Sequence, residues 1–68
     1  MRILEDKVVL TEGELELAKS AKKFDPASAA MWFGTKVRKN SPELYESLGQ
    51  DSVRKAYKLF AAGKYEVE

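Results

Sequence analysis

The side chains of this 68-residue chain that could take part in catalysis are mainly carboxylates. Glu12 with Glu16, and Glu43 with Glu46, are spaced so that each pair shares one face of a helix. A Ser–Lys arrangement is the only other chemistry left, because the chain lacks histidine and cysteine, which supply the commonest general base, metal ligand and thiol nucleophile. Carboxylate pairs of this kind are mostly solvated surface. We therefore expect no enzymatic activity, no metal, no cofactor and no small-molecule substrate.

The length of the chain limits its core. Sixty-eight residues predict a single small helical domain, residues 1–68, that buries only about 60% of the surface its unfolded form exposes. Two acidic residues, Glu5 and Asp6, lie where a signal peptide would be apolar, and the longest apolar run is Ala29 to Phe33. We expect a cytoplasmic protein that does not enter a membrane.

The charges are unevenly distributed although the net charge is only +1. Residues 1–17 carry two basic and five acidic side chains, whereas residues 18–40 carry six basic and one acidic. A near-neutral total argues against a protein that coats nucleic acid non-specifically. Part of the asymmetry has a structural explanation, because acidic residues at helix starts and basic residues at helix ends complement the helix dipole.

Capping signals predict where the helices begin and end. Thr11 followed by Glu14 fits a capping box, so a helix should begin at Glu12. Asp25-Pro26 is an N-cap followed by proline at the first helical position, and it predicts a second helix that runs to about Lys39. Ser41-Pro42 repeats this pattern.

The third predicted helix, from Ser41-Pro42 through Leu48, is short and ends at Gly49. Asp51 or Ser52 should cap the fourth helix, and Gly63 should close it. Residues 7–10 are short and β-branched, and residues 64–68 alternate apolar with charged side chains. The fold class we predict is mainly α: a compact bundle of about four short helices, with a minor two-stranded antiparallel sheet of the terminal segments as an option.

The last predicted helix separates an apolar stripe from a basic one. The apolar residues lie at i, i+3, i+4 and i+7, and they are Val53, Ala56, Tyr57 and Phe60. Arg54, Lys55 and Lys58 cluster on the other side. Two interpretations remain open: the basic stripe is the solvated face of an ordinary amphipathic helix, or it binds nucleic acid.

A local sequence similarity supports the interpretation that the basic stripe binds nucleic acid. Leu48-Gly49 ends one predicted helix, the run Ser52 to Ala56 opens the next, and Gly63 to Tyr65 leads into an extended segment. In these residues the stretch 42–65 resembles the helix-turn-helix and following strand of winged-helix bacterial repressors. The family usually places the first buried aliphatic residue of its recognition helix six positions after the glycine, whereas Val53 follows Gly49 by four. The resemblance implies a helix in the major groove of DNA, with Ser52, Arg54, Lys55 and Lys58 nearest the DNA.

A second candidate surface lies in the second predicted helix, where Met31, Trp32 and Phe33 follow one another. Because successive residues are about 100° apart, the three cannot all face one core. We expect Trp32 to point outward as the anchor of a binding site, although a small domain could also bury all three. The predicted partner-binding residues are Trp32, Phe33, Met31 and Tyr45, with Lys36, Arg38 and Lys39 as a charged rim.

The function we favour from the sequence is that of a small, non-catalytic, regulatory binding protein. It would dock onto another protein or onto a second copy of itself through the aromatic cluster. The alternative is a helix-turn-helix-type DNA-binding transcriptional regulator that uses the basic face of the last helix.

Overall fold

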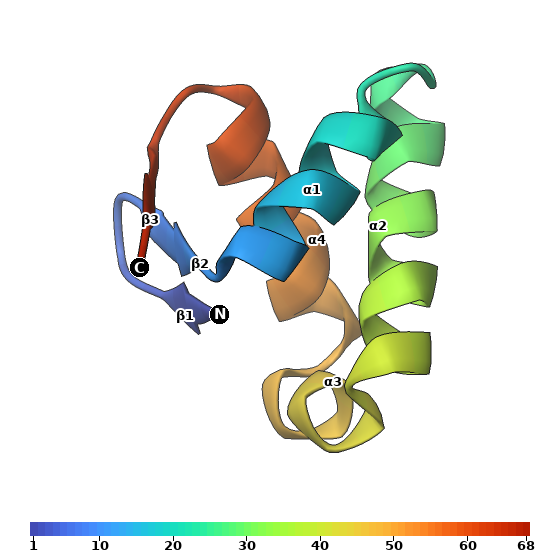
Figure 1. The fold of residues 1–68 in the computed structure, drawn as a ribbon, viewed down its shortest axis with the longest axis vertical. Helices are drawn as coiled ribbons and strands as arrows, with labels where there is room; N and C mark the ends of the chain where they lie inside the picture. Colours follow the sequence, from blue (N-terminus) through green and yellow to red (C-terminus); the bar gives the residue numbers. More distant parts are fainter.

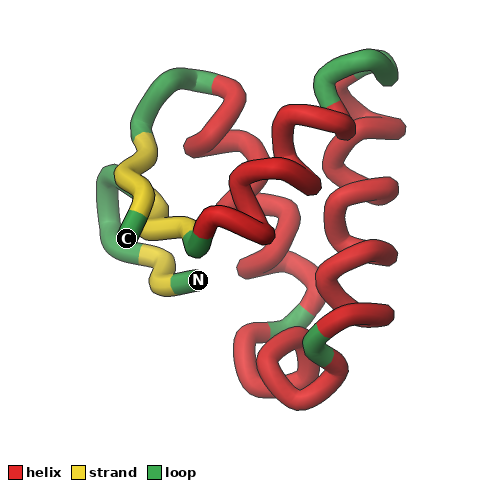
Figure 2. Tube along the Cα trace, in the orientation of Figure 1, coloured by secondary structure: helices red, strands yellow, loops and turns green.

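Four helices form the body of the molecule and a small three-stranded sheet covers one side, as the computed structural model of residues 1–68 shows (Figure 1). The elements in chain order are β1 (Arg2–Ile3), β2 (Val8–Leu10), α1 (Glu12–Ala21), α2 (Pro26–Asn40), α3 (Pro42–Leu48), α4 (Gln50–Ala61) and β3 (Tyr65–Val67). Figure 2 shows the strands gathered at one side of the helices. The predicted mainly helical fold with four short helices is confirmed.

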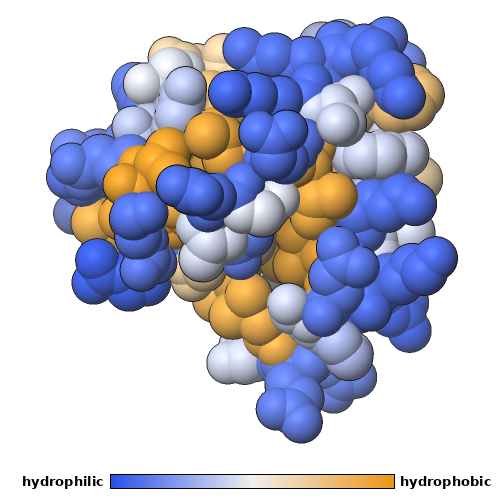
Figure 3. Space-filling view, in the orientation of Figure 1, coloured by the Kyte–Doolittle hydropathy of each residue, from blue (hydrophilic) through white to orange (hydrophobic).

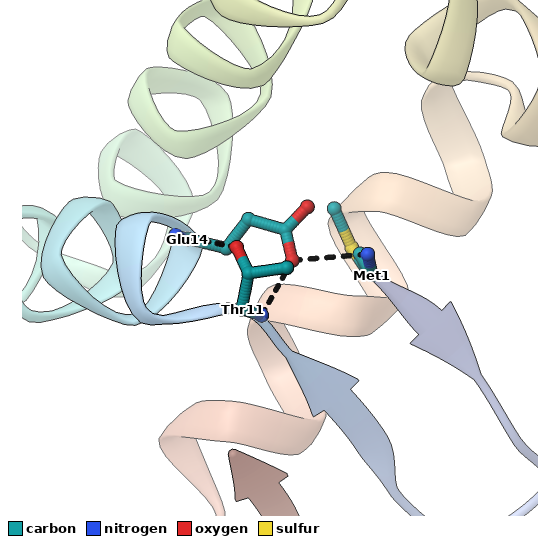
Figure 4. A network of polar contacts seen from close by, with 3 residues as sticks. All are labelled: Met1, Thr11 and Glu14. Carbon is teal, nitrogen blue, oxygen red and sulfur yellow. Dashed lines mark hydrogen bonds and ion pairs between the residues drawn. The ribbon is translucent and has the colours of Figure 1, made fainter. Parts of the chain in front are cut away.

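Helix α1 begins as predicted. The N–H of Glu14 donates to Thr11 Oγ1 at 3.2 Å, and the N–H of Thr11 donates to Glu14 Oε1 at 2.9 Å, which completes the capping box. The same Glu14 oxygen lies 3.0 Å from the amino group of Met1 (Figure 4). The carboxylate of Glu14 therefore both caps the N-terminus of α1 and forms an ion pair with the amino group of Met1.

The two proline signals also mark helix starts. Asp25 accepts a hydrogen bond from the N–H of Ser28, and hydrogen bonding from Ser28 lowers the pKa of the Asp25 carboxyl. Pro26 takes the first position of α2, where its missing N–H costs no hydrogen bond. Ser41 alone separates α2 from α3, and its side chain makes no capping hydrogen bond.

Gly49 is the only residue between α3 and α4. Its φ of 89° and ψ of 157° fall in a region that is essentially restricted to glycine. The chain therefore enters α4 directly at Gln50, and the prediction that Asp51 or Ser52 caps this helix is wrong: both lie in its first turn. Sequence patterns place a side-chain cap here, but the torsions of Gly49 start the helix without one.

Helix α4 ends at Ala61, and Gly63 closes it two residues later, as predicted. Gly63 has a φ of 81°, the N–H of Lys64 donates to the carbonyl of Leu59 at 2.8 Å, and the N–H of Gly63 donates to that of Phe60 at 2.9 Å. This pair of bonds is a Schellman motif, which needs a left-handed residue at this position. It turns the chain toward the sheet.

The sheet differs from the prediction in both strand number and direction. Its order is β1-β2-β3; β1 pairs with β2 antiparallel, and β3 pairs with β2 parallel, with Val8 opposite Tyr65 and Leu10 opposite Val67. A parallel pair needs a long crossover, and the whole helical body between the two strands supplies it. Alternation of side chains along 64–68 predicts a strand but not its direction.

The core lies where β2 meets the helices. The largest fully buried side chains are Phe33, Leu10, Val8 and Val53. The predicted apolar stripe of α4 is confirmed, because Val53, Ala56, Tyr57 and Phe60 are all at most 4% exposed. Alanines fill the remaining helix contacts, namely Ala18, Ala21, Ala29 and Ala30. Close approach of the helices follows from these small side chains.

The one-residue connection at Gly49 predicts an asymmetry between two glycines. We expect Gly49→Ala to destabilise the fold by about 1–3 kcal/mol, through backbone strain alone, since an added Cβ meets nothing within 4 Å. Gly13→Ala, in the first turn of α1 with equally open space, should stabilise it by about 0.5 kcal/mol. Urea denaturation of the two variants measures both effects. Equal stabilities would contradict the assigned torsions of Gly49.

Candidate functional site

Met31, Trp32 and Phe33 point in three directions from α2. Phe33 is 1% exposed and packs against Tyr57 with ring centroids 5.7 Å apart. Met31 is 59% exposed, the most of any large apolar side chain. Trp32 is half-buried, because the ring of Phe24 lies 5.7 Å from it. The prediction that Trp32 is the outward residue is therefore wrong: Met31 is, and Phe33 belongs to the core rather than to a surface.

The exposed side chain of Met31 lies at a groove of about 640 Å³ between α2 and α4. Helix α2 contributes Pro26, Ala27, Ala30 and Met31 to its walls. Helix α4 and the residue after it contribute Arg54, Tyr57, Lys58, Ala61 and Ala62. Alanine lines the groove at Ala27 and Ala30 of α2 and at Ala61 and Ala62 at the end of α4, which leaves space that larger side chains would fill.

The groove continues toward α3. A second hollow of about 200 Å³ shares Ala30, Met31 and Arg54 with the first. It extends along Gly34, Thr35 and Arg38 of α2 to Tyr45 of α3 and Gln50 of α4. The guanidinium of Arg38 lies 5.8 Å from the centre of the Tyr45 ring, a cation–π distance. We call the two connected hollows the α2–α4 groove.

The charged residues that line the α2–α4 groove are all basic. Arg38, Arg54 and Lys58 are its charged lining residues, and no carboxylate lines it. Its floor is apolar, with Ala30 5% exposed and Tyr57 4% exposed. An apolar floor bordered only by cations suits a ligand that carries both apolar and acidic groups.

Residues that the sequence assigned to two different sites meet here. Met31, Arg38 and Tyr45 come from the predicted partner-binding set, whereas Arg54 and Lys58 come from the predicted DNA-binding set. The groove leaves out the remaining accessible members of both sets. These are Trp32, Lys36, Lys39, Ser52 and Lys55, of which Lys39 and Lys55 are exposed and the others half-buried.

Sequence patterns do not identify the alanines and Tyr57 as lining residues. Ala27 and Ala30 lie on one side of α2, and Ala61 lies one helical repeat after Arg54. Small residues at such spacing are a signal of close helix contact, but they do not reveal which of them line a groove. Only the packing of α2 on α4 shows it.

A separate hollow of about 430 Å³ lies between α1, α2 and α3. Leu17, Val37 and Leu44 give it apolar walls, and Met1 and Glu14 close one end. Figure 3 shows hydrophobic surface running between α1 and α2 on this face, with hydrophilic surface along the outer side of α2. Because Glu14 is already engaged by Thr11 and Met1, this hollow offers fewer free polar groups than the α2–α4 groove.

The acidic residues do not assemble into a site. Glu12, Glu16, Glu43 and Glu46 are all exposed, and no group of three acidic side chains comes together as a metal site. None of the helices combines the length and the apolar character needed to cross a bilayer. No family model matches this chain, and no curated protein or solved structure is significantly similar to it.

Tyr57 on the floor of the groove predicts an alkaline instability. Burial raises the pKa of its phenol above the usual value of 10. The unfolded chain therefore releases this proton at lower pH than the folded one, so the contribution of Tyr57 is intact below pH 10 and is lost as pH rises further. Tyr57→Phe should lose less stability than wild type between pH 9 and 12 in urea titrations. Tyr45→Phe is the control; an equal effect of both variants would contradict the assignment.

Proposed function

We propose that this protein is a non-catalytic binding protein whose α2–α4 groove docks an acidic, amphipathic helix of another protein. The observation that carries the proposal is the 59% exposed Met31 beside a floor of Ala30 and Tyr57, with Arg54 and Lys58 on the opposite wall and no carboxylate among the lining residues. Exposed methionine is adaptable and is used at surfaces that accept varied apolar side chains.

The shape of the groove supports a helix as the occupant. It follows α2 from Pro26 to Arg38, which is about 18 Å at 1.5 Å per residue. That length accommodates about three turns of a bound helix, whose residues at i, i+3, i+4 and i+7 would face the alanines. Its acidic residues would face Arg38, Arg54 and Lys58, so charge fixes its orientation and speeds its association.

DNA binding by α4 is the competing proposal. It is favoured by the accessibility of its basic side chains, since Lys55 and Lys58 are exposed and Arg54 is half-buried. Two features weigh against it. Gly49 alone joins α3 to α4, where helix-turn-helix motifs use a turn of three or four residues. Arg54 and Lys58 also lie along the groove between α2 and α4. A recognition helix instead presents the side chains that contact the bases on its solvent-facing side.

Binding of a designed peptide tests the groove. The probe is a 14-residue peptide with leucine at i, i+3, i+4 and i+7, glutamate at positions flanking this stripe and alanine elsewhere, so that it retains helix propensity. We expect amide chemical-shift changes at Ala27, Ala30, Met31 and Lys58. Met31→Ala should weaken binding about tenfold, because it removes the central apolar contact, and Lys58→Glu should weaken it further.

Two controls sharpen this test. Lys39→Glu reverses an exposed charge on the same helix outside the groove and should cost little. The same peptide with lysine in place of glutamate should not bind. Shifts centred on Trp32, or full affinity in Met31→Ala, would contradict the proposal. Concentration-dependent shifts at the groove without peptide would instead identify a second copy of the chain as the occupant.

A salt titration separates the peptide proposal from the DNA proposal. Lys55 lies outside the groove, so Lys55→Ala should leave peptide affinity unchanged. If α4 instead binds duplex DNA, the same variant should lower the slope of log K against log salt by about one unit, because one phosphate contact is lost. Fluorescence anisotropy with a labelled random duplex measures the slope. A Lys55-dependent slope would favour the DNA-binding proposal.

A further inference from the structure

The other flank of α2, facing α1, carries a cluster of lysines and aromatic rings. The ammonium of Lys23 lies 5.4 Å from the centre of the Phe24 ring and 5.9 Å from that of Trp32. The ammonium of Lys36 lies 5.5 Å from the same Trp32 ring. Phe24 is 38% exposed, and Trp32 is half-buried against it. We call these four residues the lysine–tryptophan patch.

The lysines of this patch have no carboxylate partners. The two ion pairs of the protein involve Glu14 and Glu66, neither of which reaches Lys23 or Lys36. The nearest acidic residue in the chain, Asp25, directs its carboxylate to the N–H of Ser28 at the start of α2. Two ammonium groups therefore converge on one indole ring without neutralisation, and a bound anion would relieve their repulsion.

A second aromatic surface lies next to the patch. Lys22 places its ammonium 5.0 Å from the Phe60 ring, which packs against Tyr65 at 4.8 Å. Tyr65 is 37% exposed. The α1–α2 and α4–β3 connections lie at the same end of the molecule (Figure 1). The adjacent residues Lys22 and Lys23 thus lead to two exposed rings: Lys23 lies over Phe24, and Lys22 lies over Phe60, the packing partner of Tyr65.

We infer that this end of the molecule binds single-stranded nucleic acid. Phe24 and Tyr65 are exposed rings on which unpaired bases would stack, and the accessible edge of Trp32 lies beside Phe24. Lys23 and Lys36, whose ammonium groups lie over the Phe24 and Trp32 rings in the free protein, would turn from the rings to the phosphates, together with Lys22. A single strand repeats a flat base and one negative charge at every nucleotide, which matches alternating rings and unpaired lysines. An acidic peptide would use the charges but leave the rings without partners. This inference does not depend on the occupant of the α2–α4 groove.

Trp32 provides the readout, because it is the only tryptophan of the chain. The probe is a 12-nucleotide oligothymidylate, and the comparison is an abasic phosphodiester chain of the same length. We expect quenching of Trp32 fluorescence, and affinity for the oligothymidylate at least tenfold above that for the abasic chain. Three phosphate contacts predict a slope of log K against log salt near −2.

Variants separate stacking from charge. Phe24→Leu keeps an apolar side chain but loses the ring, and it should weaken oligothymidylate binding about tenfold with no change for the abasic chain. Lys23→Gln should reduce the salt slope by about 0.7, whereas Lys39→Gln, an exposed lysine outside the patch, should leave it unchanged. Circular dichroism confirms that each variant is folded.

Three outcomes would overturn the inference. Equal affinity for the abasic chain or for polyglutamate would show that the patch responds to charge alone. Equal losses in Lys39→Gln and Lys23→Gln would show that binding is diffuse. Tighter binding of duplex than of single-stranded DNA would exclude stacking as its basis. None of these results bears on peptide binding at the α2–α4 groove, which chemical shifts at Met31 report separately.

Discussion

The burial of strand β2 is the interaction on which the rest of the structure depends. Val8 and Leu10 are fully buried, and β2 is the central strand, paired with β1 on one side and β3 on the other. Helices α1 and α4 pack against it. Strand β3 follows α4, and it pairs in parallel with β2, which precedes α1. The three-residue strand β2 therefore holds the C-terminal strand against the helices.

The same arrangement decides which surfaces are left over. Helix α2 directs Phe33 into the core, which leaves Met31 on the flank beside α4 and Trp32 on the flank beside α1. Two acidic side chains have structural roles instead: Glu14 completes the capping box of α1, and Asp25 caps α2. A protein with a net charge of +1 thereby presents two positive surfaces, each with apolar or aromatic groups at its centre.

Local signals predicted most of the helix boundaries correctly. The capping box at Thr11 and Glu14, the N-cap at Asp25 and the closing glycine Gly63 each depend on residues within five positions of one another, so the pattern carries the whole interaction. The start of α4 was predicted wrongly because backbone torsions at Gly49, rather than a side-chain cap, begin the helix. The direction of β3 was wrong because it depends on where α4 delivers the chain.

The chain alone therefore indicates four short helices, the buried stripe of α4 and the absence of histidine and cysteine chemistry. Its tertiary structure decides that Met31 is the most exposed of the large apolar side chains, that Arg54 and Lys58 share a groove with it, and that Lys23 and Lys36 meet at Trp32. The physical reason is the separation along the chain of the residues that interact. Caps and turns are made by neighbours in sequence, whereas both candidate surfaces depend on contacts between residues far apart in the chain, and their geometry follows from how α2 packs against α1, α3 and α4.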